Sequence, residues 1–141
     1  MIEPFKNSFM IFEEGSKYPA EKIEKELVLE GYRLADMLSL HKFLKTGLKL
    51  PSYSHPNLDS LDEILNDPDW LEQNSGFHLR ILNYPQLLHQ ETREKKIAFI
   101  GILDSMANSL GYNAISIQNC QQIREDLAQM HIAFHSNPDE E

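Results

Sequence analysis

Cysteine is almost absent from this chain of 141 residues, because Cys120 is the single example. An internal disulfide is therefore excluded, and we expect a reducing compartment, the cytoplasm. Basic residues are also scarce, since 13 Lys and Arg stand against 22 Asp and Glu, for a net charge of −9. Nucleic acids and anionic membranes repel such a protein, so neither is an expected partner.

Long apolar runs are missing as well. No stretch approaches the roughly 18 apolar residues of a membrane-spanning helix. The first four residues lack the basic and apolar regions of a signal peptide, so we expect no leader. Hydrophobic residues make up 41% of the chain and charged residues 25%, which is typical of a soluble globular protein. The length predicts one globular domain.

Lys and Arg are absent from a whole segment, the one between Lys49 and Arg80. Six carboxylates lie in that segment: Asp59, Asp62, Glu63, Asp67, Asp69 and Glu72. The first three are spaced so that one helix face displays them together. Such a face is either ordinary solvated surface or an anionic surface for a cationic partner.

A loop and a short helix carry these charges. Pro51 and Pro56 restrict the backbone of the loop, and Asn57 is a good N-cap residue for the helix that follows. Leucines at 58, 61 and 65 predict the buried stripe of this helix. The helix is expected to end at Asn66–Asp69, because Pro68 cannot continue it. Trp70, the only tryptophan, is predicted to lie in the core.

The remaining elements alternate between strands and helices. We predict a buried strand at 26–30, a helix capped by Ser39 at 39–48, a strand at 78–82, a helix at 97–110 and a strand at 114–118. The apolar run at 9–12 predicts an edge strand, and Ile123, Leu127, Met130 and Phe134 predict a last helix over 120–135. This order favours right-handed crossovers and a small parallel sheet.

The run Leu50-Pro51-x-Tyr53, followed by Asn57-Leu58-Asp59-x-Leu61, resembles the loop and second helix of the barstar family of ribonuclease inhibitors. The likeness extends over residues 26–118. It implies an α/β fold, a barstar-like small three-stranded parallel sheet flanked by helices. We therefore expect an N-terminal extension at 1–25, a barstar-like domain at 26–119, and a C-terminal amphipathic helix with an acidic tail at 120–141.

The resemblance also implies a function, which is to bind a basic protein, a ribonuclease, and block its cationic active site. The residues expected to contact this partner are Tyr53, His55, Asn57, Asp59, Asp62 and Glu63. Two positions depart from the family pattern: Asp62 replaces an interface tryptophan, and Glu63 replaces an aspartate. Charge is kept while aromatic anchors, which usually carry interface energy, are lost.

The same residues are compatible with other functions. A chain that kept the fold and lost nuclease binding would be an interaction module, with a homodimer formed through the terminal segments. A hydrolase would need a base or nucleophile beside the carboxylates, and none is readable. His131 and His135 have the spacing of helical metal ligands but lack companion ligands. We therefore expect no enzyme, no catalytic residues, no cofactor and no metal.

Overall fold

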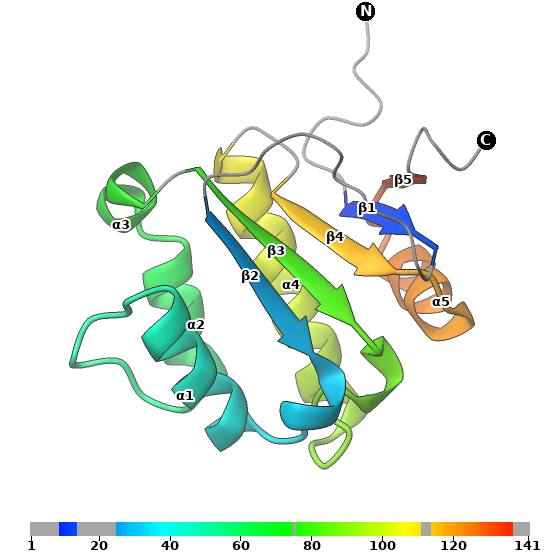
Figure 1. Cartoon of the computed structure of the whole chain (residues 1–141), viewed down its shortest axis with the longest axis horizontal. Helices are drawn as coiled ribbons and strands as arrows, with labels where there is room; N and C mark the ends of the chain where they lie inside the picture. The colour runs from blue at the N-terminus through cyan, green and yellow to red at the C-terminus, as the bar shows by residue number, and fades with distance from the viewer. Residues whose placement is uncertain (1–8, 14–24, 75, 111–113, 137–141) are drawn as a thin grey trace, which may run out of the picture.

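The computed structural model describes residues 9–13, 25–74, 76–110 and 114–136, and these form one sheet of five strands with helices packed against it (Figure 1). Every strand pair is parallel, and the strand order is β2-β3-β4-β1-β5. The strands are β1 (Phe9–Phe12), β2 (Lys25–Glu30), β3 (Phe77–Leu82), β4 (Ile115–Gln118) and β5 (Phe134–Ser136). The expected α/β fold with a parallel sheet and flanking helices is confirmed.

The helices pack against the core face of the sheet, and α4 runs the length of the strands behind it (Figure 1). Side chains alternate along a strand, so Leu79 and Ile81 of β3 belong to the core while His78 and Arg80 point to the other face. The helices are α1 (Met37–Gly47), α2 (Leu58–Leu65), α3 (Pro68–Gln73), α4 (Arg93–Leu110) and α5 (Gln121–Gln129). Short 3₁₀ turns occur at η1 (Gly31–Arg33) and η2 (Tyr84–Gln86).

The sheet is wider than the three strands expected from the sequence. The strands predicted at 26–30, 78–82 and 114–118 are present as β2, β3 and β4. The run at 9–12 forms β1, but it is not an edge strand, because it pairs with β4 on one side and β5 on the other. All four side chains of β1 are buried, as expected for an interior strand.

A strand is present at 26–30, but the prediction that this strand is buried is wrong. Lys25, Glu26 and Val28 of β2 are exposed, and Leu29 is its only fully buried residue. The reason is its place in the sheet, since β2 is the end of the strand order and pairs only with β3 among the described residues. Charged side chains on such a strand discourage pairing with other chains.

The last helix is shorter than the predicted 120–135. It ends at Gln129, and His131 adopts a left-handed backbone with φ of 59° that turns the chain. Phe134 then pairs with Phe9 in the sheet. Ile123 and Leu127 are fully buried in the core, so the apolar stripe is covered within the chain itself.

Two helix starts also differ from expectation. Asp36, rather than Ser39, caps α1, and its carboxylate accepts a hydrogen bond from the backbone N–H of Ser39 at 2.8 Å. Pro68 does follow the end of α2, but it also opens α3 as its first residue, with Asp67 as the cap. Trp70 of α3 lies in the core, as predicted.

Gly31 shows why a glycine is needed where β2 meets η1. A Cβ atom added there would lie 2.1 Å from the backbone oxygen of Asn83, which is far inside contact distance. The ends of β2 and β3 approach each other at this point, and the Glu30 carboxylate accepts a hydrogen bond from the Asn83 side-chain amide at 2.6 Å.

Candidate partner-binding surface

The loop between α1 and α2 is tied to α1 by the buried side chain of Ser54. Ser54 is 6% exposed, and its hydroxyl lies 2.9 Å from Nε2 of the buried His41 on α1. A turn in which the Ser54 N–H donates to the Pro51 carbonyl precedes this anchor. The neighbouring Tyr53 is 65% exposed, so the loop buries a serine and displays an aromatic ring.

His41 has a perturbed acidity because of this position. Burial lowers the pKa of the His41 imidazole, and the nearby charges of Lys45 and His55 lower it further. The neutral ring is therefore favoured near pH 7. A neutral imidazole has one donor and one acceptor nitrogen, which suits a hydrogen bond to a serine hydroxyl. The pair fixes the loop against α1.

A second set of hydrogen bonds fixes the start of α2. The Asn57 side-chain oxygen accepts a hydrogen bond from the Ser60 N–H at 2.8 Å, so Asn57 is the predicted N-cap. The Ser60 hydroxyl in turn accepts from the His55 N–H at 2.9 Å. These local bonds hold His55 and Asn57, both exposed, in a defined backbone geometry at the helix entrance.

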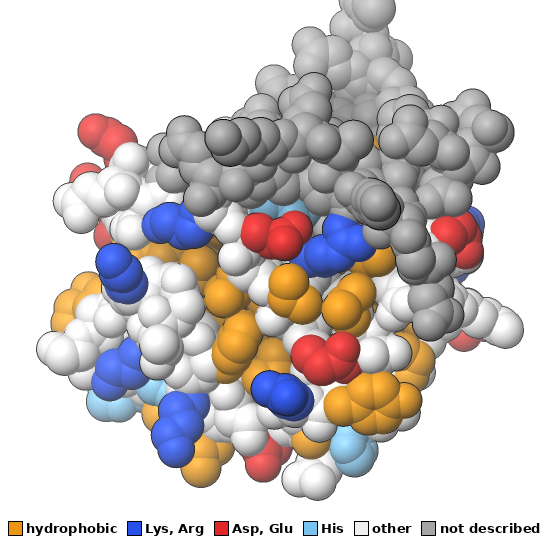
Figure 2. All heavy atoms as spheres, in the orientation of Figure 1, with side chains coloured by type: hydrophobic (Ala, Val, Ile, Leu, Met, Phe, Trp, Pro, Cys, Tyr) orange, Lys and Arg blue, Asp and Glu red, His pale blue; other side chains and the backbone are white. Residues whose placement is uncertain are grey.

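The acidic helix face is displayed as predicted. Asp59, Asp62 and Glu63 are all exposed, while Leu61 and Leu65 of the same helix are fully buried. None of the three carboxylates makes an ion pair within the part of the chain that the structure describes. Asp62 accepts a hydrogen bond from the Asn66 amide at 2.9 Å. In Figure 2 carboxylates lie over α3, at the upper left of the view.

Five of the six predicted contact residues line a single hollow beside the loop. This hollow, of about 370 Å³, is bordered by Tyr53, His55, Asn57, Asp59 and Glu63. Asp62 lies apart from it and borders a shallow groove between α2 and α4 together with Asp59. The structure thus brings the loop residues and two carboxylates together, and it turns the third carboxylate toward α4.

Sequence reasoning missed the contribution of α3 to this region. A second hollow, of about 390 Å³, lies on the other side of Tyr53 and Glu63, and α3 and its N-cap supply Asp67, Asp69 and Trp70 to its lining. From the sequence, the run Asp67-Pro68-Asp69 predicts only the end of a helix. Its proline at the first helical position, after a capping aspartate, was the available signal for a new helix.

The comparison with known families bears on this surface. The sequence matches the family model described as Barstar (barnase inhibitor) over residues 24–132, which is well over half of the chain. The chain belongs to the barstar family. No curated protein matches it.

The barstar match continues past the domain boundary predicted at residue 119. It includes α5, whose inner side chains are part of the same core as β3 and β4. The division of the chain at 25/26 and 119/120 stays a prediction. A homodimer through the terminal segments also stays a prediction, although the stripe of Ile123 and Leu127 that suggested it is buried within the chain.

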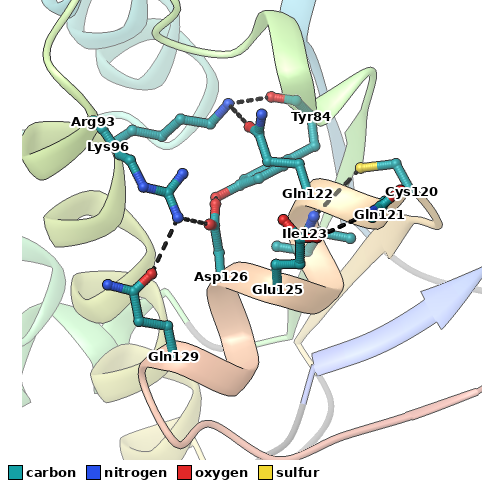
Figure 3. A network of polar contacts seen from close by, with 10 residues as sticks. All are labelled: Tyr84, Arg93, Lys96, Cys120, Gln121, Gln122, Ile123, Glu125, Asp126 and Gln129. Carbon is teal, nitrogen blue, oxygen red and sulfur yellow. Dashed lines mark hydrogen bonds and ion pairs between the residues drawn. The ribbon is translucent and has the colours of Figure 1, made fainter.

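A buried polar cluster joins α5 to the rest of this barstar-family domain (Figure 3). The carboxylate of Asp126, fully buried, accepts a hydrogen bond from the Tyr84 hydroxyl at 2.6 Å and pairs with the Arg93 guanidinium. The Lys96 ammonium donates to the Tyr84 carbonyl at 2.7 Å and to the Gln122 side chain at 2.6 Å. We call these five residues the Asp126 cluster.

Burial perturbs the acidities within the Asp126 cluster. It lowers the pKa of Lys96 to about 8, and the Asp126 carboxylate opposes part of that shift. It also raises the pKa of the Tyr84 hydroxyl, and the hydrogen bond to Asp126 adds to the effect. The buried donors and acceptors satisfy one another. The cluster thereby ties α5 to α4 and η2.

The two histidines whose spacing is typical of metal ligands do not lie on a helix in the structure. His131 and His135 cannot share a helix face, because α5 ends before both and His135 lies in β5. Among the residues that the structure describes, no three His, Cys, Asp or Glu side chains are grouped so as to hold a metal ion. No helix there has the length and apolarity to span a membrane.

Proposed function

We propose that this barstar-family protein binds a basic ribonuclease in the cytoplasm and inhibits it by occupying its cationic active site. The observation that carries the proposal is the exposed loop and helix within the family match: Tyr53 and three carboxylates stand free of any cation in the described residues. A ribonuclease must present positive charge to RNA phosphates. An anionic protein surface complements the same groups.

The inhibition needs no chemistry. Asp59 and Glu63 would face cationic side chains of the enzyme, and Tyr53 would supply an amphipathic aromatic contact. Asn57 and His55 hold the geometry of the loop, so the surface is preorganised and little ordering entropy is lost on binding. Complementary charge mainly accelerates association and selects the partner.

The first experiment is capture from the source cell. The purified chain, immobilised, should retain a basic protein with ribonuclease activity, and adding the chain should abolish that activity. Asp59→Ala and Glu63→Ala should each weaken binding by about 1–3 kcal/mol if the carboxylate is desolvated in the complex. Tyr53→Ala should also weaken it. Glu125→Ala is the matched control, since Glu125 is exposed on α5, away from the loop.

Salt separates this proposal from a merely solvated acidic face. Association should slow between about 0.1 M and 1 M salt, because the Debye length falls from about 10 Å to about 3 Å. If the double variant Asp59→Ala/Glu63→Ala captures the same partner as well as the parent does at both salt concentrations, the acidic face is not the binding surface. Capture with no loss of ribonuclease activity would instead indicate a non-inhibitory interaction module.

A further inference from the structure

The loop between α1 and α2 has one buried residue, and it is not among the residues expected to contact the partner. Between residues 51 and 57 only Ser54 is buried. Tyr53 and His55, on either side of it, are exposed and border the same hollow of the partner-binding surface. Tyr53 also borders the hollow on the α3 side. The position of Ser54 therefore sets the positions of two residues assigned to the partner.

His41 of α1 holds Ser54 in place. Its Nε2 atom lies 2.9 Å from the Ser54 hydroxyl, and the two residues are only 7% and 6% exposed. The Ser54 N–H donates to the Pro51 carbonyl, which closes a turn within the loop but does not connect the loop to a helix. Among the described residues, the bond between the two side chains is the one that joins the middle of the loop to α1.

The surroundings of His41 are cationic. The charged groups that act on its imidazole in the described residues are Lys45, on α1 itself, and His55, in the loop. No carboxylate is among them, and the sequence has no Asp or Glu between Asp36 and Asp59. Burial lowers the pKa of the His41 imidazole, and the two neighbouring groups lower it further. A proton on this ring is therefore disfavoured while the loop packs against it.

We propose that His41 is a positioning residue of the partner-binding surface, which sets the positions of Tyr53 and His55 by holding Ser54 and does not itself touch the partner. The inference rests on the proposed function for the identity of the partner, and it adds a buried residue of α1 that directs the exposed ones. A loop already held in its binding conformation loses less ordering entropy on association. Without the bond to Ser54, the affinity falls with the fraction of loops in that conformation.

A histidine in this role also makes the loop sensitive to acid. The pKa of His41 is lowered from its ordinary value of 6.5 while the loop is closed, so an open loop binds the proton more tightly. By linkage, the closed loop is fully favoured above that ordinary value. It loses population as the pH falls below it, by at most about tenfold per pH unit. A side chain that only packs, and does not titrate, would give no such pH profile.

The order of the loop can be measured without any partner. Backbone ¹⁵N relaxation of the full chain reports the motion of the Tyr53, Ser54 and His55 amides, with the amides of α1 as the reference. We expect an ordered loop in the parent at about pH 7.5 and a more mobile one at about pH 5.5. His41→Ala and Ser54→Ala should be mobile at both. His41→Gln, whose side-chain amide can bond the serine hydroxyl but does not titrate, should stay ordered at both.

The sheet offers a matched control for these variants. His78 is also a buried histidine, and its Nε2 atom lies 2.8 Å from the hydroxyl of the buried Ser116, but this pair joins β3 to β4. His78→Gln should therefore leave the motion of the loop as it is in the parent at both pH values. The inference is overturned if His41→Ala keeps the loop as ordered as in the parent. It is also overturned if His41→Gln and the parent respond alike to pH, or if His78→Gln loosens the loop as much as His41→Ala does.

Binding of the captured ribonuclease separates this inference from the proposed function. His41→Ala should weaken that binding by about two- to tenfold, which corresponds to the ordinary net contribution of one hydrogen bond, and His41→Gln should restore it. If the captured ribonuclease depends on Asp59 but binds His41→Ala as well as the parent, the proposed function stands and His41 is not a positioning residue. If the loop depends on His41 as expected while no ribonuclease is captured, the positioning of the loop stands and the inhibitor function is wrong.

Discussion

The acidic surface and the Asp126 cluster use carboxylates in opposite ways. On α2, Asp59, Asp62 and Glu63 are exposed and have no cationic partner in the described residues. In the cluster one carboxylate, Asp126, is fully buried and has an arginine partner and a tyrosine donor, with a buried lysine nearby (Figure 3). In these two regions, the carboxylate from which water is excluded is paired, and the carboxylates that water can reach are unpaired.

The difference follows from the cost of desolvation. A carboxylate taken out of water must regain its lost hydration through hydrogen bonds and opposite charge, or it destabilises the fold. An exposed carboxylate keeps its hydration and contributes little to stability. Charges that the fold does not use are available to a partner. The comparison therefore predicts that the two groups of carboxylates differ sharply in their effect on unfolding.

The largest expected effect is at Asp126. Asp126→Asn keeps the shape of the side chain and removes the charge, which leaves Lys96 buried without its nearby anion. We expect a loss of about 3 kcal/mol in the free energy of unfolding, as for a broken buried pair. The half-exposed Arg93 adds little, because water can solvate it. Urea denaturation measures the change.

The control for Asp126 lies on the same helix. Glu125→Gln removes an exposed carboxylate of α5 and should shift stability by less than about 0.5 kcal/mol. Similar losses in the two variants would contradict the assignment of the cluster as a structural tie. They would mean that net charge, rather than the buried pairing, controls stability here.

The next effect is the pH dependence that Lys96 produces. Its folded pKa is about 8, below the ordinary value of 10.5, so between these values the unfolded chain binds the proton that the folded chain has released. The free energy of unfolding should therefore rise with pH from about 8, by at most about 1.4 kcal/mol per pH unit for one proton. Above about pH 10 the raised pKa of Tyr84 acts in the opposite direction.

A variant isolates the lysine contribution to this slope. Lys96→Met keeps much of the apolar stem and removes the titrating group. We expect the slope of unfolding free energy against pH between 8 and 10 to be smaller in this variant than in the parent, whatever its absolute stability. Chemical denaturation at several pH values gives both slopes. Equal slopes would show that Lys96 keeps its proton in the folded chain.

The sequence could predict the loop and helix because their determinants are local. Asn57 caps a helix that begins at the next residue, and Leu58, Leu61 and Leu65 need only helical periodicity to define the buried side. The absence of Lys and Arg from this segment is equally visible in the chain. The Asp126 cluster had no such signal. Arg93 and Asp126 lie 33 residues apart, and only the tertiary fold brings them together.

The end of the sheet formed by β5 also could not be predicted from the sequence. Ile123, Leu127, Met130 and Phe134 continue one helical repeat, yet the helix ends at Gln129 and Phe134 enters a strand. The spacing of apolar residues does not reveal the left-handed turn at His131. It also does not reveal that the last strand pairs with β1. Likewise, the apolar run of β1 indicated a strand but contained no information on which neighbours it would have.

The smallest expected change in the free energy of unfolding is at the acidic surface, and its direction can be predicted. Glu63 lies near the C-terminal end of α2 and four residues after Asp59, so both the helix dipole and the like charge disfavour it. Glu63→Gln should therefore raise the free energy of unfolding by about 0.3–0.5 kcal/mol. Asp59 lies in the first turn, where the dipole favours a negative charge, so in Asp59→Asn the two effects nearly cancel. Urea denaturation at low salt should resolve the difference between the variants, and 1 M salt should remove most of it. A loss above about 1 kcal/mol for Glu63→Gln would show that this carboxylate supports the fold, and the contrast with Asp126 would then fail.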